Sequence, residues 1–237
     1  MARKRKTRRP AAPPIASRDK SSREKIIDAF LALLAEKSFE RIGLAEIAAR
    51  AKVSLADLRG IFDSAFAILA AHIKDIDRAV LAGIDADMAE EPARERLFDV
   101  LMRRLELLEP HKAAVRSLMR SAVRNPALAL ALNGLAVRSQ QWMLTAAGIT
   151  AAGPRGLLRA QGLALLFANV LRTWVDDDEK GLPRTLAALD RALASGERWS
   201  GLLDDLCSIP ERCCQRAKRA RGRSRRSDRA GDESMAA

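Results

Sequence analysis

The residue types that most often carry catalysis or bind metals are few in this chain and are not grouped. The only two histidines, His72 and His111, are far apart and lack the spacing of metal ligands. Cys213 and Cys214 are adjacent, but the three cysteines fit neither a zinc site nor a disulfide framework. The acidic run 176–179 offers carboxylates to a cation, although an acidic stretch just before Gly181 is more typical of an exposed turn. We therefore expect no catalysis, no metal and no cofactor.

The basic residues, in contrast, are concentrated at the two ends of the chain. The 237 residues carry a formal charge of +12. Residues 1–20 hold eight basic and one acidic side chain, residues 211–237 hold nine and four, and residues 21–210 balance at 25 of each. Segments this rich in cations attract polyanions, above all nucleic acid. The C-terminal segment would also suit an anionic membrane surface or serve only as a solubilising tail.

The segment between these ends predicts an all-α protein. Ala, Leu, Arg and Glu dominate, tyrosine is absent, and no stretch alternates with the period of two that is typical of strands. Prolines at 92, 110, 126, 154 and 183 suit first helical turns, where the missing N–H removes no helical hydrogen bond. The expected helices are 23–37, 44–51, 55–61, 63–81, 92–108, one from 110, 126–147, 153–175 and 183–206.

These elements divide into two folded parts with basic ends. We expect a disordered basic arm over 1–20, a small three-helix domain over 21–75, a larger helical bundle over 76–206, and a disordered basic tail over 207–237. No apolar run reaches the roughly 18 residues that span a bilayer, and the N-terminus does not read as a secretory signal. We expect a cytoplasmic protein.

Residues 44–61 carry the most informative pattern, which is typical of a helix-turn-helix. Ile47, Ala48 and Ala51 fall on one side of the first short helix, together with Leu44. Ser54 followed by Asp57 predicts a capping box that starts the second short helix. Two short helices crossing over a tight turn allow the second helix to enter the major groove of DNA.

This stretch resembles the TetR family of bacterial transcriptional repressors. The similarity runs through Ile26–Phe30, Leu44–Ser54 and Leu58–Ser64. The resemblance implies a homodimer that binds double-stranded DNA through the helix-turn-helix. It makes 21–75 the DNA-binding domain and 76–206 the ligand-binding and dimerisation domain, which would hold a small-molecule effector. On this basis the expected DNA-binding residues are Arg3, Arg5, Lys52, Ser54, Leu55, Asp57 and Arg59.

The sequence also departs from that family. Lys52 stands where a glycine is usual, and Arg59 and Ala65 replace a phosphate-contacting aromatic residue and a lysine. A left-handed backbone at Lys52 would cost about 1–2 kcal/mol. Residues 21–75 contain eight basic and eight acidic residues, so the helix-turn-helix unit is neutral. We therefore expect the N-terminal arm to supply much of the attraction to phosphate.

The C-terminal half gives two weaker indications. Leucines spaced by four, three and four residues predict a dimer seam, although core packing would explain the same pattern. The seam residues are Leu182, Leu186, Leu189 and Leu193. Bulky apolar residues on the middle helices would line a pocket for a small apolar effector, or would simply fill the core. The pocket residues are Phe98, Met102, Met119, Trp142 and Phe167.

A second resemblance offers an alternative function. The stretches 94–97, 105–116, 174–178 and 187–191 are similar to ubiquinone-biosynthesis accessory proteins. Those proteins share the TetR fold but bind isoprenoid lipid and do not read DNA. This alternative is consistent with the neutral helix-turn-helix unit.

Overall fold

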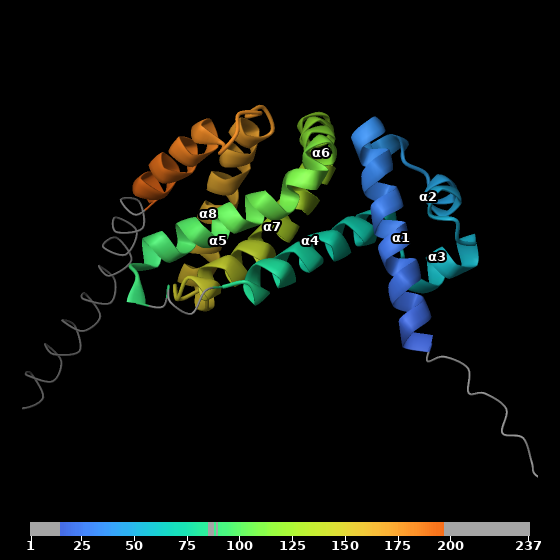
Figure 1. The fold of residues 1–237 in the computed structure, drawn as a ribbon, viewed down its shortest axis with the longest axis horizontal. Coiled ribbons are helices and arrows are strands. Elements are labelled where there is room, and N and C mark those ends of the chain that lie inside the picture. Colours follow the sequence, from blue (N-terminus) through green and yellow to red (C-terminus); the bar gives the residue numbers. More distant parts are fainter. Residues whose placement is uncertain (1–14, 85–87, 89, 197–237) are drawn as a thin grey trace, which may run out of the picture.

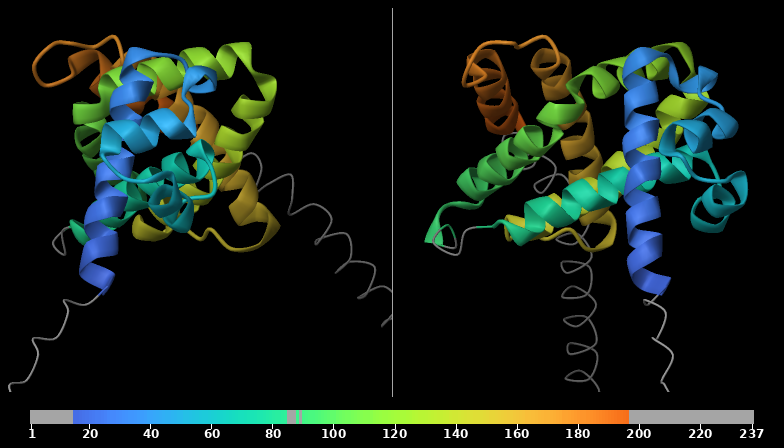
Figure 2. Two further views of the ribbon diagram at one scale, coloured as in Figure 1. Left: turned by 90° about the vertical axis from the view of Figure 1, so that its right-hand side faces the viewer. Right: turned by 45° about the vertical axis from the view of Figure 1, so that its right-hand side comes forward.

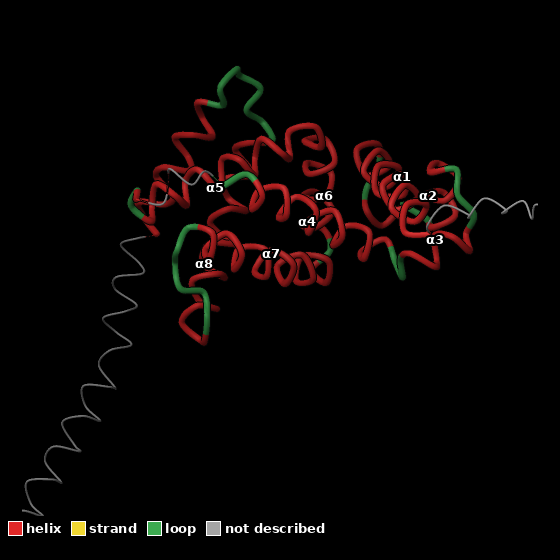
Figure 3. Tube along the Cα trace, turned by 60° about the horizontal axis from the view of Figure 1, so that its bottom comes forward, coloured by secondary structure: helices red, strands yellow, loops and turns green. Residues whose placement is uncertain are grey.

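A computed structural model describes residues 15–84, 88 and 90–196, and every regular element in these ranges is helical (Figures 1 and 3). The elements are α1 (Ile15–Glu36), η1 (Phe39–Arg41), α2 (Leu44–Ala51), α3 (Leu55–Ile61), α4 (Ala65–Ala82), α5 (Ala93–Leu108), η3 (Glu109–His111), α6 (Lys112–Arg124), α7 (Pro126–Ala146), α8 (Gly153–Trp174) and a last helical segment over 183–196. The all-α fold class is confirmed.

The N-terminal unit is built around α1, which contacts α2, α3, α4 and α6. Its core combines apolar residues that recur at helical spacing along α1 with Ile47, Leu58 and Ile68 from the next three helices. Fully buried Phe30 meets Phe39 edge to face, with ring centroids 6.2 Å apart. At one end of the molecule α2 and α3 therefore lie on the outer side of α1 (Figures 1 and 2).

The helical body has its own core. The C-terminal half of α4 contributes Ile76 and Val80, and α5, α7, α8 and the 183–196 helix complete the apolar cluster, with Trp174 fully buried. Helices α7 and α8 pack along each other, and α4 contacts α1 at one end and both α5 and α7 at the other. Helix α4 thus takes part in both cores (Figure 1).

The helix boundaries follow the predicted ones closely, with two main differences. Helix α1 begins at Ile15, so residues 15–20 belong to a helix and not to a disordered arm, and neither Ser21 nor Ser22 caps it. Pro110 lies in η3, and α6 itself begins at Lys112. The rest of the predicted N-terminal arm (1–14), the end of the last predicted helix (197–206) and the tail over 207–237 lie outside the described residues.

Candidate nucleic-acid interface

The helix-turn-helix has the bounds that the sequence predicts, and its turn is left-handed at Lys52. This residue adopts φ 55° and ψ 42°. The turn is closed by backbone hydrogen bonds, in which Lys52 N–H donates to Ala49 O over 3.2 Å and Val53 N–H donates to Ala48 O over 3.0 Å. The strained backbone thus positions an exposed lysine between the two short helices.

The start of α3 is fixed by the predicted capping box. Asp57 N–H donates to Ser54 Oγ over 3.0 Å, and Ser54 N–H donates to Asp57 Oδ2 over 3.3 Å. The Ser54 hydroxyl also donates to Asp57 Oδ2 over 2.7 Å. Because these groups satisfy one another, Ser54 and Asp57 hold the helix end in this structure and leave Leu55 and Arg59 as the projecting side chains of α3.

The outer face of α3 is short, exposed and weakly charged. Leu58 anchors the helix in the N-terminal core, whereas Leu55 is 55% exposed and Gly60 has nothing near its Cα that would obstruct a side chain. Arg59 is paired with Asp63 one turn along, and both side chains are largely exposed. The one cation on the outer face of α3 is therefore held by an intramolecular carboxylate.

Cations on the neighbouring helices are paired in the same way. Arg50 of α2 donates two hydrogen bonds to Glu36 of α1, at 2.9 and 2.8 Å, and Lys37 is paired with Glu46. The hydrogen bond from Arg50 lowers the pKa of Glu36 below its ordinary value. These pairs brace α2 against α1, whereas Lys52 forms no ion pair among the described residues.

Helix α6 joins the N-terminal unit to the body through hydroxyl groups. The Ser117 hydroxyl donates to Lys37 O over 2.8 Å, and Phe39 N–H donates to Ser121 Oγ over 3.1 Å. Both serines are buried, and Asn125 at the end of α6 donates to Glu40 over 3.3 Å. A movement of α6 would therefore carry η1 and the C-terminal end of α1 with it.

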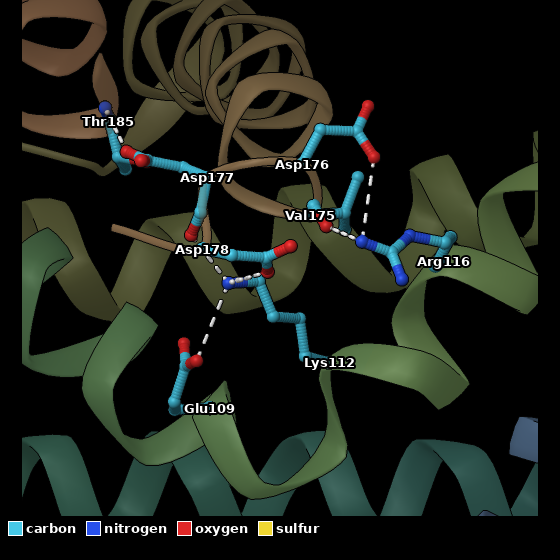
Figure 4. A network of polar contacts seen from close by, with 8 residues as sticks. All are labelled: Glu109, Lys112, Arg116, Val175, Asp176, Asp177, Asp178 and Thr185. Atoms are coloured by element: carbon cyan, nitrogen blue, oxygen red, sulfur yellow. Dashed lines mark hydrogen bonds and ion pairs between the residues drawn. The ribbon is translucent and has the colours of Figure 1, made fainter. Parts of the chain in front are cut away.

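The N-terminal half of α6 is attached to the turn between α8 and the 183–196 helix (Figure 4). Lys112 Nζ donates to Asp177 O over 2.7 Å and lies 3.4 Å from a carboxylate oxygen of Asp178. Arg116 donates to Val175 O and lies 3.4 Å from Asp176. The ammonium of Lys112 also lies 5.4 Å from the centroid of the Trp174 ring. Helix α6 is thus held at both ends.

The acidic run at 176–179 is therefore only partly the exposed turn that we expected. Asp177 is fully buried, and its Oδ2 accepts hydrogen bonds of 2.8 Å from both the N–H and the hydroxyl of Thr185. This carboxylate caps the 183–196 helix, while Asp176 and Asp178 point to the two cations of α6 (Figure 4). Among the described residues no group of three or more potential ligands is arranged to hold a metal ion.

The body contains a buried polar network that the sequence did not predict. Arg104 of α5 is paired with Asp77 of α4 and donates to Ser139 of α7, whose hydroxyl donates to Asp77 over 2.7 Å. The guanidinium lies 5.5 Å from the centroid of the Phe167 ring. Burial lowers the pKa of Arg104, and the nearby Asp77 opposes that shift. The network ties α4 to α5 and α7.

The predicted effector-pocket residues do not all lie together. Phe167 is buried in the core, and Phe98, Met102 and Met119 are half-buried against it. Trp142, however, is 57% exposed on the outer face of α7. Trp142 is thus separated from the covered apolar surface of the other four, because helical spacing alone does not show which face of α7 is covered.

The predicted dimer seam is also divided by the fold. Leu189 and Leu193 are buried in the core of their own chain, so they are not available to a second copy. Leu182 packs against the same core with a positive φ of 52°. Five of the nine large exposed apolar side chains among the described residues lie instead on α7 and α8: Leu130, Trp142, Leu157, Leu158 and Leu165.

Sequence reasoning missed contacts between residues that are far apart in the chain. His72 and His111 are in ring contact, and Asp77, Arg104 and Ser139 form the buried network. The buried serines of α6 were missed as well. No local spacing marks these residues, because each has its partner on another helix.

Comparison with solved structures places this arrangement among known proteins. A TetR transcriptional regulator from Nitrosomonas europaea superposes with a TM-score of 0.59 at 24% identity, covering 74% of this chain and 97% of that one. A TetR transcriptional regulator from Rhodococcus sp. RHA1 superposes with a TM-score of 0.54 at 23% identity, covering 76% of this chain and 97% of that one. A TetR-family regulator from Streptomyces coelicolor superposes with a TM-score of 0.51 at 18% identity, covering 80% of this chain and 86% of that one. No protein-family model and no curated protein matches the sequence.

These likenesses define the class by its fold: the chain has the fold of TetR-family transcriptional regulators. The resemblance inferred from residues 44–64 is thereby supported by the arrangement of the whole described chain. None of the described helices is long and apolar enough to cross a membrane.

Proposed function

We propose that the protein is a DNA-binding transcriptional regulator that reads DNA through α2 and α3. The observation that carries this proposal is the helix-turn-helix itself, with its left-handed turn, capped second helix and exposed outer face, at one end of a TetR fold. A capped α3 with a projecting Leu55 and Arg59 suits insertion into a major groove. Lys52 is placed for a phosphate contact, and the exposed Leu55 for a thymine methyl group.

The proposed interface needs cations beyond α3, because the three-helix unit has no net charge. Arg3 and Arg5 belong to a basic N-terminal stretch outside the described residues, and α1 begins at Ile15 directly after it. We propose that these arginines add phosphate or minor-groove contacts beside those of α3. The C-terminal basic tail, also outside the described residues, would suit the same polyanion; contact with a membrane has no further support.

The protein would act as a homodimer that pairs through α7 and α8, so that each copy contributes one DNA-reading unit formed by α1 to α4. The side-chain amides of Asn133 and Gln161 bond reciprocally, at 2.9 and 3.0 Å, and fix α7 against α8. Beside this bridge lie the exposed Leu130, Leu158 and Leu165, together with two glycines, Gly134 and Gly162, that have open space around them. Exposed leucines with intervening glycines allow helices of a second copy to approach closely. This face replaces the predicted leucine seam.

Regulation would come from a small effector in the helical body, as in a repressor that releases DNA. The half-buried Phe98, Met102 and Met119 offer apolar surface, and Met119 lies on α6 between the anchoring residues Ser117 and Ser121. A ligand that displaced α6 would move η1 and α1 through Ser117 and Ser121. We propose a cytoplasmic, non-catalytic protein with this mechanism.

The proposal is tested by mobility shift with duplexes from the region upstream of its own gene. A sequence-specific complex that is lost when α3 is altered by Leu55→Asp supports it, with unchanged circular dichroism as the control for folding. The variant Asp63→Asn is expected to tighten binding several-fold, because it frees Arg59 and removes a negative charge near the DNA. Binding that ignores sequence, together with co-purified isoprenoid in mass spectra, would favour the lipid-binding alternative.

A further inference from the structure

The only two histidines of the chain meet where the N-terminal unit joins the helical body. His72 lies on α4 and His111 is the last residue of η3, yet their ring centroids are 4.9 Å apart with the planes at 88°. On α4, Ile68 and Leu69 before His72 belong to the N-terminal core, whereas Ile76 after it belongs to the core of the body. The ring contact therefore lies at the boundary between the two cores.

The contact requires neutral rings. His72 is 8% exposed, and its Nε2 has no hydrogen-bond partner, so a proton on that nitrogen would be buried without an acceptor. Burial, with a smaller contribution from His111, lowers the pKa of His72 to about 4. Burial also lowers the pKa of the half-buried His111.

The charged groups around the pair do not offset this penalty. Asp75 of α4 favours a charged His72, but its carboxylate is held by Arg23 through hydrogen bonds of 2.6 and 3.1 Å. Arg104 of α5, itself paired with Asp77, opposes the charge. Asp28 of α1 favours a charged His111. Burial outweighs these contributions, so both rings pack in their neutral form.

We propose that the His72–His111 contact is a pH-sensitive joint, which opens on acidification and loosens η3 and the start of α6 from α4. Because α6 holds η1 and α1 through Ser117 and Ser121, opening changes how α2 and α3 are held. The effect on DNA rests on the proposed function, whereas the opening itself does not. The sign follows from linkage: an unfolded histidine titrates near 6.5, so the contact is stable above that pH and is lost as the pH falls toward about 4.

The experiment follows both rings and the joint in the full chain. With only two histidines, the ring C–H resonances report each protonation directly by NMR. With Trp142→Phe and Trp199→Phe, the remaining Trp174, which lies beneath Lys112 next to His111, reports on the start of α6 by fluorescence. We expect His72 to titrate with a pKa of about 4 and the Trp174 emission to change over the same pH range, while far-UV circular dichroism stays constant.

Two variants separate the joint from general acid unfolding. His72→Phe removes the buried titrating group and should abolish the Trp174 transition. His111→Asn, at a half-buried position that tolerates a polar side chain, should raise the pKa of His72 and move the transition to higher pH. His72 titrating near 6.5, a Trp174 response that coincides with loss of helix, or a transition unchanged in both variants would overturn the proposal.

Measuring duplex binding as a function of pH tests the link to regulation. We expect the affinity of the parent chain for its duplex to fall at least about twofold between pH 7 and pH 4, the range in which His72 titrates, beyond the fall seen in His72→Phe. If neither protein binds DNA at any pH, the proposed function fails. The NMR and fluorescence results still show whether the His72–His111 contact opens on acidification. If both lose affinity equally, the joint does not control the reading helices.

Discussion

Lys52 combines a cost to folding with a contribution to the proposed function. Its left-handed backbone is one that L-residues with a side chain adopt at a cost of about 1–2 kcal/mol, and glycine would avoid that cost. The same position holds an exposed ammonium that has no ion-pair partner among the described residues. The backbone strain at Lys52 therefore lowers stability while it positions a cation between two short helices. Such strain is typical of residues that contact a ligand.

This trade-off predicts opposite effects of one substitution. Lys52→Gly should raise the free energy of unfolding by up to about 1 kcal/mol and weaken duplex binding, with a shallower dependence of affinity on salt. Chemical denaturation and a salt titration of binding measure the two effects. Lys52→Asn, which tolerates the left-handed backbone but lacks the charge, is the matched control and should reproduce only the loss of binding. A gain in affinity with glycine would show that Lys52 does not face phosphate.

At this scale the local features were predictable and the distant ones were not. The Ser54–Asp57 capping box spans one helical turn, so its spacing identifies it in the sequence. His72 and His111, or Asp77 and Arg104, meet only because α4 packs against η3 and α5. The residues next to each of them in the sequence do not indicate such a pair, because the pair is created by tertiary packing.

Among the elements, the 183–196 helix depends on a carboxylate outside it. Asp177 is buried and accepts two hydrogen bonds from Thr185 in the first turn of that helix. Asp177→Ala leaves this N–H and hydroxyl without an acceptor, so it should cost about 2–3 kcal/mol of unfolding free energy in urea denaturation. Asp177→Asn keeps an acceptor oxygen and should cost clearly less. Equal losses in the two variants would show that an uncharged acceptor oxygen does not replace the carboxylate at this position.

Element boundaries were largely encoded by single residues, whereas the faces of the elements were not. Pro126 opens α7, Ser64 accepts a hydrogen bond at the start of α4, and Ser54 starts α3. The spacing of Leu189 and Leu193, however, is the same whether a helix packs on its own core or on a second copy. The choice depends on what the rest of the fold already covers, and these two leucines are covered by it.

The molecule as a whole has an unpartnered apolar face on α7 and α8. Leu130 is 74% exposed and Leu165 is 61% exposed, beside the Asn133–Gln161 bridge that holds the two helices together. A cluster of exposed leucines on rigid helices is costly in water and is typical of an interface between subunits.

Placing a charge on this face should dissociate the proposed dimer. We expect Leu165→Glu to convert the protein to a monomer in sedimentation analysis and to lower its affinity for a palindromic duplex by at least tenfold, because one reading unit then binds alone. Leu44→Glu, at an exposed leucine on α2, is the control and should leave the dimer intact. A dimer that persists in Leu165→Glu would place the interface elsewhere.

The double attachment of α6 has a consequence for chimeras built on this fold. A chimera that joins the N-terminal unit to another helical body is naturally cut in α4, which contributes to both cores. Such a cut would leave Ser117, Ser121 and Asn125 behind, and with them the acceptors and donors that hold η1 and the end of α1. The exchangeable module is therefore residues 15–84 together with a matched α6, two stretches that are separate in the gene and must be transplanted as one.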